Sequence, residues 1–159
     1  MTLSAPLRII VGADEAGYEL KQAVKAFFDA DYRVAQVIDI GVDSAADPTA
    51  YPSIGIEAGN RIAAGQADRA LLVCGTGIGV AIAANKVPGI RATVAHDAFS
   101  VERSVLSNDA QVLTFGGRVI SAHLARKLAD EWLRHEFDPT SASAAKVAEI
   151  TDYEAATPS

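Results

Sequence analysis

The chain has 159 residues, of which half are hydrophobic and 21% are charged, and its formal net charge at pH 7 is −6. This length and composition suit one domain with a buried core, and the acidic balance argues against general binding to nucleic acid or to acidic membranes. No apolar run approaches the roughly 18 residues of a membrane span, and the N-terminus lacks the regions of a signal peptide. The lone cysteine, Cys74, cannot form an internal disulfide, and no metal-ligand spacing is present. A cytoplasmic protein without a metal site is therefore expected.

Apolar runs alternate with helical patterns along the chain. In order, the patterns predict a strand over 7–13, a helix over 16–30, a strand over 33–41, a helix over 54–65, a strand over 69–74, a helix over 78–87, a strand over 89–96, a helix over 97–109, a strand over 110–117, and helices over 120–137 and 144–156. The strands are almost continuously apolar, which is typical of strands covered on both faces. This order predicts a single domain over 1–159, an α/β fold built as a three-layer α/β/α, Rossmann-like sandwich with a five-stranded parallel sheet.

In such a sheet, ligands bind beyond the carboxyl ends of the strands. The segments expected at that edge follow the five strands in turn: "DEAG", "DPTAYP", "CGTGIG", "HD" and "GGR". A ligand site is therefore predicted where these loops meet.

The segment "CGTGIG", residues 74–79, is a glycine-rich turn that presents backbone N–H groups to an anion at the start of a helix. It lacks the Gly-Lys-Ser/Thr ending of a nucleotide-binding P-loop and is not a clean dinucleotide fingerprint. Cys74 stands at the junction of strand and helix, where a thiolate can act as a nucleophile or a base, although single cysteines also pack as small hydrophobes. Thr76 is either a partner of the thiol or substrate, or a helix cap.

Four further polar residues are expected at the same edge. Asp14 is suited to sugar hydroxyls or to a helix cap, and Glu15 to the first turn of a helix. His96 is either an acid/base group or a hydrogen-bonded structural histidine, and Arg118 is suited to a phosphate. Together with the thiol and the N–H groups, this set favours proton abstraction next to a carbonyl, with a developing enediolate held by backbone N–H groups.

Over almost its full length the sequence resembles the ribose-5-phosphate isomerase B / galactose-6-phosphate isomerase family. The resemblance is carried by "VGADEAGYELK", "AYP", "LLVCGTGIGVAIAANKVPGIRATVAHD", "SNDAQVLTFGGRVI" and "AAKVAEI". It implies cofactor-free aldose–ketose isomerisation of a sugar phosphate through a cis-enediolate. It also implies a homodimer or a dimer of dimers with active sites shared between subunits, so residues 138–153 are expected to pack on a partner subunit.

The resemblance also implies a role for each matching residue. Cys74 matches the base that moves a proton between C1 and C2, and Thr76 matches the residue that assists it. The enediolate oxygens are expected at the backbone of Gly75, Gly77, Ile78 and Gly79.

Substrate contacts are implied at five more positions. Asp14 and Asn108 match residues that bind substrate oxygens, and Tyr51 matches a residue that lines the pocket. Arg118 matches a phosphate-binding arginine, and Lys146 stands for one of two basic phosphate ligands that the partner subunit supplies.

Two departures from the family pattern bear on the substrate. Glu15 stands where pentose isomerases have histidine, and Ser107 replaces the histidine that opens the furanose ring. In a tetrose 4-phosphate, O4 is esterified and only O3 remains, so ring closure would give a four-membered ring and no ring-opening residue is needed. The stretch "AHDAFSVERSVLSNDAQVL" also resembles D-erythrulose-4-phosphate isomerases, and the resemblance implies interconversion of D-erythrulose 4-phosphate and D-erythrose 4-phosphate.

Two other interpretations stay open. One is a pentose- or hexose-phosphate isomerase in which His96 assists ring opening. The other is a non-catalytic sugar-phosphate-binding paralogue, suggested by the loss of two histidines and by an alanine near Ala142 in place of a basic ligand. The retained thiol of Cys74 argues against the second, because binding alone needs no thiolate.

Overall fold

The computed structural model describes residues 3–157, so the outermost residues of the predicted 1–159 domain lie outside the described part. Five parallel strands form one sheet in the order β2-β1-β3-β5-β4. Their bounds are β1 (Leu7–Ala13), β2 (Val34–Asp39), β3 (Arg69–Cys74), β4 (Ala92–Val94) and β5 (Val112–Gly116). The predicted fold class, an α/β fold with a five-stranded parallel sheet, is confirmed.

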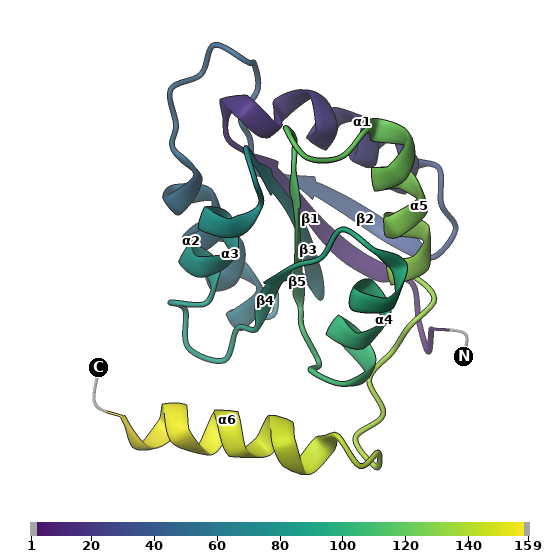
Figure 1. Ribbon diagram of the computed structural model, residues 1–159, viewed down its shortest axis with the longest axis vertical. Coiled ribbons are helices and arrows are strands. Elements are labelled where there is room, and N and C mark those ends of the chain that lie inside the picture. Colours follow the sequence, from purple (N-terminus) through teal and green to yellow (C-terminus); the bar gives the residue numbers. More distant parts are fainter. Residues whose placement is uncertain (1–2, 158–159) are drawn as a thin grey trace.

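Helices cover both faces of the sheet, with α1, α4 and α5 on one face and α2 and α3 on the other (Figure 1). The elements are the short 3₁₀ helix η1 (Glu15–Gly17), α1 (Tyr18–Asp29), α2 (Tyr51–Ala63), α3 (Ile78–Ala84), α4 (Ala98–Leu106), α5 (Ala122–Trp132) and α6 (Ala144–Ala156). Alternation along β3 assigns side chains to the two cores: Leu71 and Val73 face α1 and α5, whereas Leu72 and Cys74 face α2 and α3.

Several helix boundaries differ from the prediction, and two of them have a clear local reason. Helix α2 begins at Tyr51 rather than at residue 54, because Pro52 lies in its first turn, where a missing N–H costs nothing. Helix α5 ends at Trp132 rather than at residue 137. There the buried Arg69 guanidinium donates hydrogen bonds to the carbonyl oxygens of Trp132 (3.2 Å) and His135 (2.7 Å), which gives these groups partners outside a continued helix.

Arg69 is expected to contribute strongly to stability. It is 9% exposed, and its guanidinium carbon lies 5.3 Å from the Trp132 ring centroid. Burial lowers the pKa of Arg69 to about 10, so the group stays charged at neutral pH. Arg69→Met keeps most of the apolar stem but removes the charged donor from both carbonyl groups and leaves that of Trp132 with only a long bond from the His135 N–H (3.4 Å), so we expect it to lower the free energy of unfolding by about 2–4 kcal/mol. Urea unfolding measures this, with the exposed Arg134→Met as control; a loss below about 0.5 kcal/mol would contradict the role.

Helix α6 stands apart from the rest of the chain (Figure 1). Only Val147 of this helix is buried, and Tyr153 is 76% exposed. The N–H of Gly89 donates a hydrogen bond to Glu154 Oε2 (2.7 Å), which ties the far end of α6 to the body. A hollow of about 420 Å³ lies between them, at the edge where β4 and β5 begin. Among residues 3–157, no helix combines the length and the apolar character that crossing a membrane requires.

Candidate active site

An open cleft of about 610 Å³ lies at the carboxyl edge of the sheet. Strand β1 lies in the sheet between β2 and β3. The chain passes from β1 to β2 on one side and then continues to β3 on the other side of β1. Open α/β sheets bind ligands at such a reversal of the strand order. The cleft is lined by Asp14, Glu15, Ala16, Tyr51, Cys74, Gly75, Thr76, Ile78, Gly79, Ile82 and Arg118. Among these, the sequence assigns no site role to Ala16 and Ile82; Ile82 lies one helical turn after Ile78, and that spacing is the signal that would have found it.

Cys74 is the last residue of β3 and contributes to the cleft, although it is only 3% exposed. Its Sγ accepts a hydrogen bond from the Gly77 N–H (3.1 Å). Gly77 has φ +80°, and a Cβ there would lie 2.9 Å from the Phe115 carbonyl carbon, so only glycine fits this turn. The sulfur therefore lies next to an N–H donor and to the start of α3. The family resemblance assigns the Gly77 N–H to an oxygen of the enediolate. In the structure this N–H donates its hydrogen bond to the Cys74 sulfur instead.

The first turn of α3 faces the cleft through its backbone. The leading N–H groups of a helix have no intrahelical partner, and Gly79 lies among them. A Cβ on Gly79 would lie 2.6 Å from Cε2 of Tyr51, so the ring packs directly on the backbone of α3. Thr76 is exposed, and its Oγ1 accepts a hydrogen bond from the Ile78 N–H (3.3 Å). The turn therefore offers N–H donors to an anionic oxygen close to the thiol.

The cleft carries one cation and two carboxylates. Arg118 is exposed, packs against Gly75 and makes no side-chain ion pair among residues 3–157. Asp14 is held in place, since its Oδ1 accepts a hydrogen bond from the Gly17 N–H (3.1 Å). Glu15 is exposed and has no side-chain partner in the described part of the chain. Arg118 is thus the group in the cleft that is free to bind a phosphate.

Asn108 and Lys146 lie away from the cleft. Asn108 stands between α4 and β5 and lines the hollow below the sheet, where its Nδ2 donates to the Arg103 carbonyl oxygen (2.9 Å). Lys146 belongs to α6, beside Tyr153. Because Asn108 precedes β5 whereas Cys74 ends β3, the two residues stand at opposite edges of a parallel sheet. A single chain therefore does not bring Asn108 to Cys74. Ser107, which directly precedes Asn108, likewise lies away from Cys74 within one chain.

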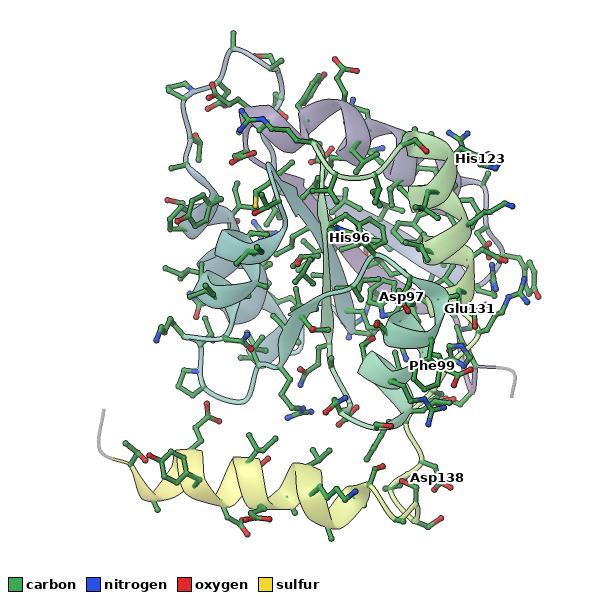
Figure 2. All side chains as sticks on the ribbon, viewed as in Figure 1. His96, Asp97, Phe99, His123, Glu131 and Asp138 are labelled. Atoms are coloured by element: carbon green, nitrogen blue, oxygen red, sulfur yellow. The ribbon has the colours of Figure 1, made fainter. Side chains whose placement is uncertain are left out.

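His96 is half-buried beside β5 and does not line the cleft (Figure 2). Its Nε2 accepts a hydrogen bond from the Gly116 N–H (2.9 Å), and its ring centroid lies 6.1 Å from that of Phe115. Desolvation lowers the pKa of His96, and the neighbouring Asp97 opposes the shift only in part. The accepted hydrogen bond also requires an unprotonated Nε2. These contacts favour a neutral, structural histidine over an acid/base group.

A pH-dependent stability is expected from this contact. The folded-state pKa of His96 lies below the ordinary value, so the unfolded chain binds a proton first and stability falls as pH drops below about 6.5. His96→Gln keeps an acceptor for Gly116 and does not titrate. Urea unfolding at pH 5.5 and 7.5 is expected to show a smaller loss for the variant than for the wild type, with kcat at pH 7.5 unchanged within about threefold. An equal loss of stability in both proteins, or a large fall in kcat, would refute the structural role.

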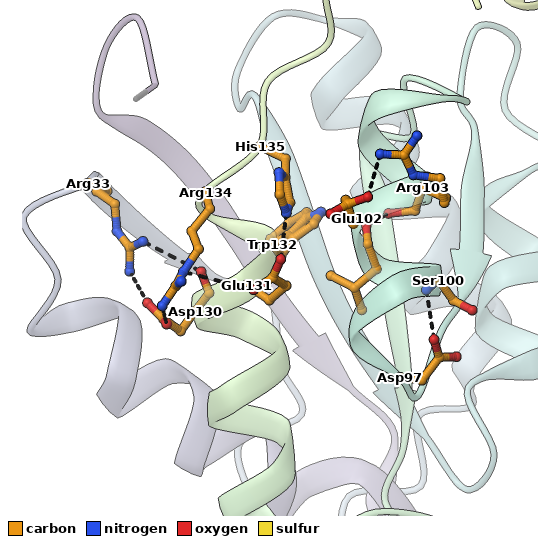
Figure 3. Close-up of polar contacts among 12 residues, drawn as sticks. Arg33, Asp97, Ser100, Glu102, Arg103, Asp130, Glu131, Trp132, Arg134 and His135 are labelled. Atoms are coloured by element: carbon orange, nitrogen blue, oxygen red, sulfur yellow. Dashed lines mark hydrogen bonds and ion pairs between the residues drawn. The ribbon is translucent and has the colours of Figure 1, made fainter. Parts of the chain in front are cut away.

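One cluster of potential metal ligands lies outside the cleft (Figure 3). Ligand atoms of Glu102, Glu131 and His135 lie within 4.8 Å of one another. They already have protein partners: His135 Nε2 lies 2.8 Å from Glu131 Oε1, and Glu102 pairs with Arg103. The two carboxylates are therefore already paired, Glu102 within α4 and Glu131 at the end of α5.

Comparison with known proteins identifies the family. The family model described as Ribose/Galactose Isomerase matches residues 9–150. The chain belongs to this family. A protein named D-erythrulose-4-phosphate isomerase 2, from Mycolicibacterium smegmatis, is 58% identical over 150 residues, which cover 94% of this chain and 99% of that protein. The D-erythrulose-4-phosphate isomerase of Pectobacterium atrosepticum is 39% identical over 148 residues, or 93% and 97% of the two chains.

The solved structures agree with the sheet described above. Ribose-5-phosphate isomerase B from Clostridium thermocellum superposes with a TM-score of 0.86 at 37% identity, covering 93% of this chain and 97% of that one. The predicted enzyme class is confirmed: this is an isomerase family protein that acts on sugar phosphates by aldose–ketose interconversion. The roles of individual residues stay predictions.

Proposed function

We propose that the chain interconverts D-erythrulose 4-phosphate and D-erythrose 4-phosphate. The observation that carries the chemistry is the position of Cys74, whose sulfur accepts a hydrogen bond from Gly77 and lies in the same cleft as Arg118, which makes no side-chain ion pair among residues 3–157. A thiolate there can reach a carbon next to a carbonyl while the guanidinium holds a phosphate. The two relatives named for the same tetrulose phosphate support the choice of substrate.

The mechanism moves one proton between adjacent carbons. The Cys74 thiolate removes a proton from C1 of the ketose, and the electron pair moves toward the C2 carbonyl oxygen to give a cis-enediolate. Free N–H groups in the turn of residues 75–79, Gly79 among them, stabilise the charge on the oxygens. A proton then moves from O1 to O2, with Thr76 as a hydrogen-bond partner, and return of the proton from Cys74 to C2 gives the C1 aldehyde of the aldose. Arg118 binds the phosphate throughout and takes no part in the proton transfer.

The length of the substrate is argued from Ser107. A tetrose 4-phosphate has no hydroxyl that closes a five-membered ring, so it enters the cleft open-chain and a serine suffices where pentose isomerases have histidine. The alternative is ribose 5-phosphate, as the name of the Clostridium thermocellum relative suggests. In that case ring opening needs an acid/base group, and the described cleft holds no histidine.

We also propose a homodimer in which a second copy completes the cleft. Asn108 and Lys146 lie at the opposite edge of the sheet from Cys74, so they reach a cleft only in another chain. Helix α6, within the 138–153 segment expected to pack on a partner, leaves Ile150 and Tyr153 exposed, which suits that contact. The reaction is expected in the cytoplasm, where the charge of phosphorylated sugars retains them.

A substrate panel tests the proposal. Initial rates with D-erythrose 4-phosphate, ribose 5-phosphate and galactose 6-phosphate give kcat/KM for each sugar, and the tetrose is expected to exceed the others by at least about 10-fold. A higher kcat/KM for ribose 5-phosphate would replace the tetrose assignment by the pentose one. Binding without turnover of any of the three would favour the non-catalytic paralogue.

A further inference from the structure

Glu15 is the charged residue of the cleft to which neither the family resemblance nor the mechanism gives a role. It is the first residue of η1, directly after Asp14, and it is exposed toward the cleft. Asp14 is fixed by its bond to the Gly17 N–H, whereas the Glu15 carboxylate has no partner among residues 3–157. An unpaired carboxylate in a cleft that binds a phosphate dianion costs binding energy unless the phosphate stays away from it.

The backbone places Glu15 close to the phosphate-binding arginine. The loop after β5 crosses directly over η1: a Cβ on Gly117 would lie 2.5 Å from the Ala16 carbonyl oxygen and 3.3 Å from the Gly17 Cα. Arg118 follows Gly117 in the chain, and Arg118 and Glu15 both line the cleft. A phosphate bound to Arg118 therefore shares the cleft with the Glu15 carboxylate.

We infer that Glu15 is a specificity-determining residue that limits the length of the sugar phosphate. This inference rests on the proposed function. With C1 and C2 held at Cys74, the phosphate of a pentose 5-phosphate lies about one carbon–carbon bond, ~1.5 Å, farther along the chain than that of a tetrose 4-phosphate. The shorter substrate keeps its phosphate at Arg118, whereas the longer one carries its charge past the guanidinium toward Glu15. Repulsion between the phosphate of the longer sugar and the Glu15 carboxylate adds to the preference for tetrose phosphates that Ser107 gives. The repulsion weakens binding of the pentose phosphate, whereas Ser107 affects ring opening.

The test removes the charge and keeps the shape. In Glu15→Gln, the ratio of kcat/KM for ribose 5-phosphate to that for D-erythrose 4-phosphate is expected to rise at least about 10-fold, through a lower KM for the pentose. Turnover of the tetrose is expected to stay within about threefold. Glu15→Asp, which keeps the charge, should leave the ratio near the wild-type value. So should Glu19→Gln, which makes the same charge change at an exposed position of α1 outside the cleft.

The outcomes separate this inference from the proposed function. A wild-type protein that prefers the tetrose, together with a ratio unchanged within twofold in Glu15→Gln, overturns the role of Glu15 and leaves the proposed function intact. A parallel fall of both activities in Glu15→Gln marks a structural role and likewise overturns it. A wild-type protein that prefers ribose 5-phosphate overturns both.

Discussion

Cys74→Ala is expected to lower kcat by about 10³-fold with either direction of the reaction. The cleft offers no second thiol to replace Cys74, and Oδ1 of Asp14 already accepts a hydrogen bond from the Gly17 N–H. The Gly77 N–H that stabilises the sulfur would lose its partner without disturbing the glycine turn. A coupled assay of tetrose phosphate isomerisation measures the loss.

Binding gives the control for this variant. Arg118 holds the phosphate and does not contact the substituted side chain in the mechanism, so inorganic phosphate should bind Cys74→Ala as it binds the wild type in calorimetric titration. Arg118→Met should show the opposite behaviour, with weaker phosphate binding and an intact thiol. A Cys74→Ala protein with wild-type kcat would remove the thiol from the mechanism.

The second large effect concerns the shared site. Asn108→Ala is expected to lose most activity by itself, as Cys74→Ala does. In a dimer of either variant, every cleft lacks one of the two residues that the two chains contribute, Cys74 from one chain or Asn108 from the other. When the two variant chains are mixed by co-refolding, half of the dimers are hybrids and each hybrid has one intact cleft, so about a quarter of wild-type activity should return. A matched mixture of Cys74→Ala with Thr76→Ala, both from the same half of the cleft, should regain none, because no cleft then combines two intact halves.

No return of activity in the first mixture would show that Asn108 and Cys74 act from the same chain or that Asn108 has no role. An Asn108→Ala homodimer with full activity would support the second of these. Either result would contradict the two-chain cleft.

Local patterns in the sequence predict much of the fold and of the cleft. The apolar run that ends at Cys74 identifies β3, and the glycines that follow identify the turn, because both depend on residues next to one another in the chain. The helix over 144–156 is predicted with its observed bounds for the same reason.

What local patterns miss depends on distant partners. The end of α5 depends on Arg69, which is 63 residues away from Trp132 in the chain. The structural contact of His96 requires the Gly116 N–H of a strand 20 residues later, so the sequence leaves both interpretations of this histidine open. Likewise, the family resemblance implies that Asn108 and Cys74 both belong to the site. Only the sheet topology shows that, within one chain, the two residues lie at opposite ends of the parallel strands.

Proton transfer at Cys74 on a tetrose phosphate is the central claim, and it is tested most directly by isomerisation in D₂O. With D-erythrulose 4-phosphate as substrate, proton NMR is expected to show D-erythrose 4-phosphate that carries deuterium at C2, because a thiol exchanges its proton with solvent during the life of the enediolate. Cys74→Ala should show neither product nor exchange at C1 of the ketose. Product without any deuterium would mean that the hydrogen moves from C1 to C2 without exchange with solvent, and no product from D-erythrulose 4-phosphate would show that the substrate is a different sugar phosphate; either result would contradict a solvent-exchanging thiol that acts on a tetrose phosphate.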